Sequence, residues 1–276
     1  MIMLPSEELL TIEDVAEDRR RRTALLAALT VGTVGPASVL WFGTGLCSML
    51  LALMVGAGAF VVASRYEVEG RFRAVFRIRH LREAGLAAVT KLTAGDVAGA
   101  RDGFVALLPQ ARSMQAIHAT HVLMYGVTRF LEGDTTEGLR LAERALKSGW
   151  FDLPKMRDLE RAAATWTTMM LVTAKRLGDA RALLTQRPAY ATASVVLEAA
   201  EGRFTEAVST ARAALGAADF PPAGRPTVAI VGLFAARQLN ESHAITEFEA
   251  VLAATPPGPL ALKNPALAPF LPAAFR

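Results

Sequence analysis

The sequence predicts an all-α protein in which a membrane hairpin of two helices precedes a solenoid of about four to five helix-turn-helix units. Alanine and leucine, both strong helix formers, are abundant, whereas the Val, Ile and Thr runs typical of strands are scarce. An uncharged apolar block and a recurring glycine–turn–alanine pattern complete the evidence. The predicted segments are an acidic N-terminal segment (1–22), the transmembrane hairpin (23–64), a basic juxtamembrane helix (65–82), the helical repeats (83–256) and a proline-rich tail (257–276).

Charge is distributed unevenly along the 276 residues. Residues 1–18 hold six acids and no base, residues 65–82 hold six arginines, and the rest is close to balanced. Because phosphate binding requires a concentrated basic face, we expect no nucleic-acid partner for the repeats. The single cysteine, Cys47, excludes an intramolecular disulfide and a multi-cysteine zinc site.

The apolar block predicts two membrane spans. No Lys, Arg, Asp, Glu or His occurs from Thr23 to Ser64, about twice the roughly 20 residues that one helix needs to cross a bilayer. Spans at 23–41 and 46–64 fit, because the glycines of the intervening 43–45 permit a tight turn. Trp41 would then lie at the headgroup level.

The flanking arginines predict the orientation. Basic residues precede the first span and follow the second, so the positive-inside rule places both termini in the cytoplasm. The excess of arginine over lysine suggests a GC-rich bacterial genome, and hence a bacterial inner membrane. We expect contact with the membrane surface at Trp41, Arg71, Arg73, Arg77 and Arg79. The basic helix can lie on an anionic leaflet or pack on the following helix.

Other interpretations of the N-terminal third fit less well. A cleaved signal peptide has a short apolar region after a basic start, unlike this long block after an acidic one. A lipoprotein cysteine follows a small residue, but Leu46 precedes Cys47. A buried helical hairpin inside a soluble protein remains an alternative. The acidic residues 1–22 form either a short helix or a solvated tail.

A repeated pattern occupies residues 83–256. Glycine or a substitute is followed by a polar turn and, about five residues later, by alanine. The third copy is displaced and shortened, and the others recur at roughly 35–40 residues, a period typical of solenoids. The copies are AGDVAGARDGF (94–104), EGDTTEGLRLAERAL (132–146), LGDARALL (177–184), EGRFTEAVSTARAAL (201–215) and LNESHAITEFEAVLAATP (239–256).

This pattern resembles the tetratricopeptide repeat, which has glycines in its first helix and turn, an alanine and an aromatic in its second helix, and a proline beyond it. The matching residues are Gly232, Ala244, Phe248 and Pro256; Gly95, Ala100 and Phe104; Gly126, Gly133 and Ala145; and Gly202, Ala207 and Ala214. The family's early Trp and the Tyr of its first helix are mostly missing. An irregular bundle of alanine-rich hairpins is therefore the alternative.

The resemblance implies binding of a peptide or protein along a groove formed by first helices. In the second unit the groove-facing candidates are Thr120, Leu123, Val127 and Phe130. The tail cannot continue a solenoid because of its prolines. We expect it either to cap the array, with Phe270 and Phe275 as anchors, or to hang free.

No catalytic motif is present, so we expect no enzyme activity and no cofactor. His118 and His121 share a helical face, but no carboxylate on an adjacent turn completes a metal site. The sequence therefore predicts a membrane-anchored scaffold or adaptor that binds a protein partner at the cytoplasmic face. A structural subunit of a transport, secretion or envelope-assembly complex is the alternative, and either is compatible with a homo-oligomer or a larger membrane complex.

Overall fold

The computed structural model describes residues 5–20, 23 and 78–275, and their regular secondary structure is entirely helical. The all-α prediction is thus confirmed for these residues. Nearly all of the predicted hairpin (23–64), together with Trp41, Arg71, Arg73 and Arg77, lies outside them. No helix in this described part has both the length and the apolar character needed to cross a bilayer.

The chain divides into two compact units. The described residues 5–12 and 84–275 belong to one unit, and residues 13–83 belong to the other. In the smaller unit, Arg79 forms an exposed ion pair of 2.9 Å with Glu83, one helical turn further along. The larger unit resumes at Ala84, next to the predicted start of the repeats at residue 83, and the division after Ile12 falls inside the predicted segment 1–22.

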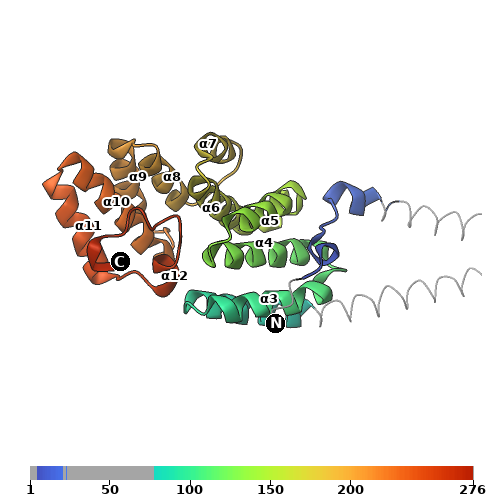
Figure 1. Cartoon of the computed structure of the whole chain (residues 1–276). Coiled ribbons are helices and arrows are strands. Elements are labelled where there is room, and N and C mark those ends of the chain that lie inside the picture. Colours follow the sequence, from blue (N-terminus) through green and yellow to red (C-terminus); the bar gives the residue numbers. More distant parts are fainter. Residues whose placement is uncertain (1–4, 21–22, 24–77, 276) are drawn as a thin grey trace, which may run out of the picture. The chain divides into compact units, whose positions relative to one another are not determined.

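The larger unit consists of five consecutive helix pairs (Figure 1). Helical residues 84–93 pack against α3, and in each later pair two successive helices pack against each other. The helices are α3 (Val97–Ala111), α4 (Gln115–Leu131), α5 (Thr135–Lys147), α6 (Arg157–Thr173), α7 (Leu177–Gln186), α8 (Ala191–Ala200), α9 (Phe204–Gly216), α10 (Arg225–Leu239) and α11 (Ser242–Ala254). The first helices α4, α6, α8 and α10 contact one another in sequence, and we call their layer the inner face.

The turns within the five pairs have one geometry. The residue with positive φ is Gly95, Gly133, Lys175, Gly202 or Asn240, with φ between 55° and 96°. The following residue donates its N–H to the carbonyl five positions earlier, over 2.9–3.0 Å. This is the Schellman bond that closes a helix C-terminus. A repeat-like helical architecture is therefore present.

The predicted third turn was misplaced. Its left-handed residue is Lys175, with φ of 61°, whereas Gly178 lies inside α7 without a positive φ. A lysine at this position hides the turn from a search for glycine. The third pair is also irregular because α7 has only 10 residues, and the next pair begins with α8, which has 10 as well.

Small residues bring paired helices into close contact. A Cβ on Gly138 of α5 would lie 2.8 Å from the carbonyl oxygen of Gly126 in α4. A Cβ on Gly232 of α10 would lie 2.7 Å from Cζ of Phe248 in α11. Neither position has room for a larger side chain, which explains glycine at two positions of the repeated pattern.

Candidate functional site

The C-terminal segment 257–275 packs along the inner face. Figure 1 shows this segment, in red, crossing from α10 and α11 toward α3. Lys263 Nζ donates to the Gly95 carbonyl at 2.7 Å, and Asn264 Nδ2 donates to Met169 Sδ at 3.2 Å. The segment therefore contacts the first and third helix pairs.

Apolar side chains and one amide hold the segment in place. Phe270 stacks edge-on against Phe234 of α10, with ring centroids 5.1 Å apart, and is 6% exposed. Leu267 is fully buried, and Asn264 Oδ1 accepts the N–H of Ala266. Capping is thus the alternative that the structure favours. Phe270 is an anchor as expected, whereas Phe275 is only partly buried.

Local sequence explains the shape of this segment. Prolines prevent a long helix, and Pro259 opens the single helical turn α12 (Pro259–Leu262), which ends at Lys263. Short-range bonds such as Leu267 N–H to the Asn264 carbonyl then fold the chain into consecutive turns. The segment follows the inner face in this way without continuing the solenoid.

A hollow of about 520 Å³, which we call the inner hollow, lies beside the segment. The aromatic residues Trp166, Tyr190 and Phe220 line it together with prolines, threonines and part of the tail. None of the described residues that line it is charged. Its chemistry suits an uncharged ligand that offers apolar surface and backbone carbonyls.

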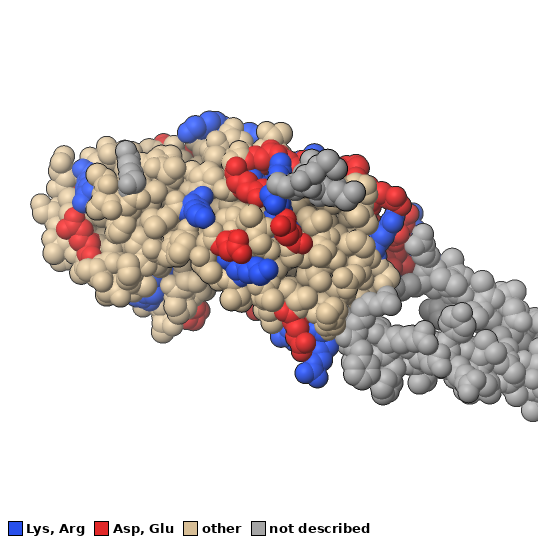
Figure 2. Space-filling model, turned by 60° about the horizontal axis from the view of Figure 1, so that its bottom comes forward, with Lys and Arg blue, Asp and Glu red and all other residues tan. Residues whose placement is uncertain are grey.

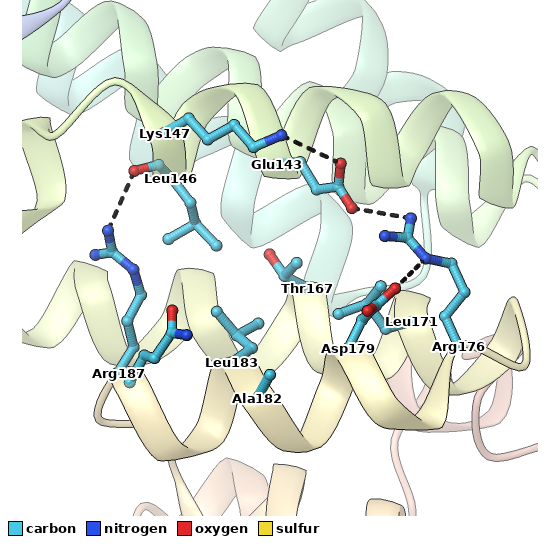
Figure 3. A pocket seen from close by; sticks show the side chains of 11 residues that line it. Glu143, Leu146, Lys147, Thr167, Leu171, Arg176, Asp179, Ala182, Leu183 and Arg187 are labelled. Atoms are coloured by element: carbon cyan, nitrogen blue, oxygen red, sulfur yellow. Dashed lines mark hydrogen bonds and ion pairs between the residues drawn. The ribbon is translucent and has the colours of Figure 1, made fainter.

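A second hollow, of about 350 Å³, lies between α5, α6 and α7 (Figure 3). At one end Arg176 bonds Glu143 at 3.0 Å and Asp179 at 2.6 Å. At the other end Arg187 donates to the Leu146 carbonyl at 3.4 Å and pairs with nearby acids. Lys147 also lines the hollow and lies 3.9 Å from Glu143, so each cation among the described lining residues has a carboxylate of the chain as its partner.

The surface charge is mixed where it can be seen. On the face drawn in Figure 2, acidic and basic side chains lie in small groups of both signs, separated by wide uncharged areas. No broad basic patch occupies that face. The absence of a nucleic-acid partner stays a prediction.

The predicted groove residues are mostly core residues. Leu123, Val127 and Phe130 are 2%, 0% and 0% exposed, because α4 packs against α3, α5 and α6. Thr120 is partly exposed, and its hydroxyl donates to the Ala116 carbonyl at 3.0 Å. As a set, these residues offer little surface to a partner.

Sequence reasoning missed the residues of the inner hollow. Their signal was the presence of Trp166, Tyr190 and Phe220 in a chain with only 7% aromatic residues, the last of them followed directly by Pro221 and Pro222. The missing information was that α6, α8 and the loop before α10 converge.

The predicted histidine pair is buried. His118 Nε2 lies 3.2 Å from the carbonyl oxygen of Thr11, and desolvation lowers its pKa. Desolvation, with a smaller effect from His118, lowers the pKa of His121 to about 4. Within the described ranges no group of three or more His, Cys, Asp or Glu is placed to hold a metal. The pair therefore contributes to packing below the N-terminal segment.

Residues 5–12 dock on the larger unit, so this part of the acidic segment is not a solvated tail. Glu7 pairs with Arg140 at 2.7 Å and Arg144 at 2.6 Å, both on α5. Hydrogen bonds from these two arginines lower the pKa of Glu7 to about 2. Leu10 is buried at the end of a short 3-10 helix (Glu7–Leu10).

The fold and site define a helical-repeat protein that carries its own C-terminal segment on its inner face. No family model, curated protein or solved structure matches the chain.

Proposed function

We propose that this protein is a membrane-anchored, tetratricopeptide-like scaffold or adaptor that holds a protein partner at the cytoplasmic face of a bacterial inner membrane. The observation that carries the proposal is the inner face, on which an uncharged, aromatic-lined hollow lies beside a proline-rich segment of the chain that is folded in turns. Solenoids of helix pairs commonly bind extended segments on such a surface.

The likeness to tetratricopeptide repeats is supported by the pairing geometry. Five turns share one backbone conformation. The number of residues between successive turns is smallest from Lys175 to Gly202, an interval that holds the short helices α7 and α8. Gly126, seven residues before the turn glycine Gly133, meets the small residue Gly138 of the partner helix. These are the contacts for which the repeated pattern supplies small residues.

The membrane anchor is supported by chain connectivity. Residues 5–12 and 84–275 belong to the same compact unit, and the apolar block 23–64 lies between them in sequence. A chain that leaves a folded unit and returns to it must cross a membrane an even number of times, if it crosses at all. The ion pairs of Glu7 and the pair between Glu8 and Arg112, at 2.9 Å, therefore agree with a two-span hairpin and two cytoplasmic termini.

Site-specific photo-crosslinking in native membranes tests the adaptor function. We expect benzoyl-phenylalanine in place of Trp166, at the inner hollow, to form an adduct with a polypeptide partner. The control position is Leu239, which is exposed at the C-terminal end of α10. The hollow lies at the other end of this helix, where Pro226 and Thr227 line it. Equal adducts at both positions, or none at Trp166, would contradict binding at the inner face.

Cysteine labelling tests the topology separately. In a Cys47→Ala background, Thr44→Cys should react with an impermeant reagent from outside the membrane. Ser209→Cys, at an exposed position of α9, should react only after permeabilisation. Labelling of both cysteines from the same side would exclude the hairpin.

A further inference from the structure

We propose that the inner face recognises a proline-containing segment that folds into turns, carries an aromatic anchor and is uncharged where it contacts the hollows. The chain's own residues 257–275 are the resident occupant of this surface, and a partner segment of the same chemistry displaces them. The inference rests on the proposed adaptor function and names both its ligand class and its regulation.

The tail occupies the inner face as a bound segment does. Its buried side chains, among them Asn264, Leu267 and Phe270, alternate with exposed ones such as Lys263 and Ala268. The buried ones meet α6 and α10 through the Met169 and Phe234 contacts, whereas Ala268 faces solvent and Lys263 reaches the Gly95 carbonyl with its Nζ. A core element of a solenoid would instead be enclosed by helices on both sides.

The surface around the tail selects against charge. The inner hollow has no charged lining residue among those described. A smaller hollow, of about 310 Å³, lies beside Pro269 and Phe270, and Lys175 is the one charged residue among the described residues that line it. A charged ligand side chain would lose its hydration in either hollow without gaining an ion pair in the first. The ligand is therefore expected to be uncharged where it contacts these walls.

Proline is favoured by the aromatic walls. Segments in the polyproline II conformation have no internal hydrogen bonds, and they dock on aromatic-lined grooves with their carbonyls free to accept. Trp166 and Tyr190 each carry a donor at the inner hollow, and neither the indole N–H nor the phenol hydroxyl bonds another described residue. The tail itself has prolines at 257, 259, 265, 269 and 272 and folds into the helical turn α12 and further turns, so the surface already holds a proline-rich segment.

A tethered occupant excludes a weak competitor. A short tether gives an effective concentration on the order of millimolar, so a peptide that binds the empty face with micromolar affinity is weakened on the order of 100-fold or more. Only a partner that binds more tightly, or that is concentrated at the membrane, would displace the tail. The tail thus sets a threshold for partner binding.

A peptide-binding experiment on the full chain tests this inference. The probe is a fluorescent peptide of residues 257–275, and its binding is measured by anisotropy. Phe270→Ala in the chain removes the tail's anchor but leaves the receptor surface intact, so we expect at least tenfold tighter peptide binding than for the wild type. Phe234→Ala removes the receptor's side of the same ring contact and should give no such gain.

Two further variants guard against misfolding. Leu267→Ala, at a fully buried tail position, should also increase peptide binding, whereas Ala268→Ser, at an exposed one, should not. Circular dichroism must show unchanged helix content in each variant. A control peptide carrying Phe270→Ala should bind at least tenfold more weakly than the probe.

Each outcome decides the inference. If neither release variant binds the peptide, the tail is a permanent part of the fold and the inference is wrong. If the wild-type chain dimerises in light scattering and the Phe270→Ala chain does not, the occupant is a second copy's tail and a separate partner is contradicted. If Trp166 still forms adducts with a partner in either case, the proposed adaptor function is retained. Peptide binding without Trp166 adducts would support the site and remove the adaptor function.

Discussion

Replacing Gly138 by alanine tests the close approach of α4 and α5. The new Cβ would lie 2.8 Å from the Gly126 carbonyl oxygen, 2.9 Å from Phe130 Cβ and 3.1 Å from Phe130 N. Two of these atoms are backbone atoms of α4, so they can move only if the helices separate. Overpacking of this kind costs about 1–3 kcal/mol. The better helix propensity of alanine returns up to about 1 kcal/mol.

We therefore expect Gly138→Ala to lower the free energy of unfolding by roughly 0–2 kcal/mol, the cost of overpacking less about 1 kcal/mol from helix propensity. Urea unfolding followed by far-ultraviolet circular dichroism measures the loss. Hydrogen exchange should locate it in α4 and α5, because solenoids lose stability locally.

Gly178→Ala is the matched control. Gly178 is exposed in α7, has no positive φ, and its added Cβ would meet no atom within 4 Å. The substitution should raise stability by about 0.4–1 kcal/mol through the unfolded state. The reasoning would be refuted if Gly138→Ala were as stable as Gly178→Ala, with exchange in α4 and α5 unchanged.

Three further predictions concern backbone strain and pH. Gly133→Ala, at φ of 96° with open space around it, should cost about 1–2 kcal/mol in urea unfolding, from conformation alone. Glu7→Gln should lower the thermal midpoint at neutral pH. Because hydrogen bonds from Arg140 and Arg144 lower the pKa of Glu7 from 4.5 to about 2, this difference should disappear as pH falls across that interval. Burial lowers the pKa of His121 from 6.5 to about 4. As pH falls, the unfolded chain therefore binds this proton first, and the folded state should lose up to about 3 kcal/mol of stability between these pH values. In urea unfolding at a series of pH values, His121→Phe should abolish the loss that His121 causes.

Local features of the fold could be predicted because they depend on neighbouring residues. Helices follow from alanine and leucine content, and four of the five turns have a glycine or asparagine where the backbone needs a positive φ. The third turn was misplaced because Lys175 adopts that conformation instead, held by the same Schellman bond. Amino-acid propensities do not indicate that a lysine will adopt this left-handed conformation.

The site could not be predicted in the same way. Helical register suggested that Leu123, Val127 and Phe130 face a groove, but register alone does not say how many helices cover α4. The aromatic lining of the inner hollow comes from α6, the start of α8 and the loop before α10, which meet only in the folded chain.

By itself, the sequence determined the helical class, the paired helices and the place of most turns, since these depend on contacts within a few residues. Tertiary structure alone decided where the two terminal segments lie. Asn264 bonds Met169, 95 residues away, and Glu7 bonds Arg140, 133 residues away. Such contacts depend on how the helix pairs stack, because stacking brings the Gly95 turn, α6 and α10 within reach of one short tail.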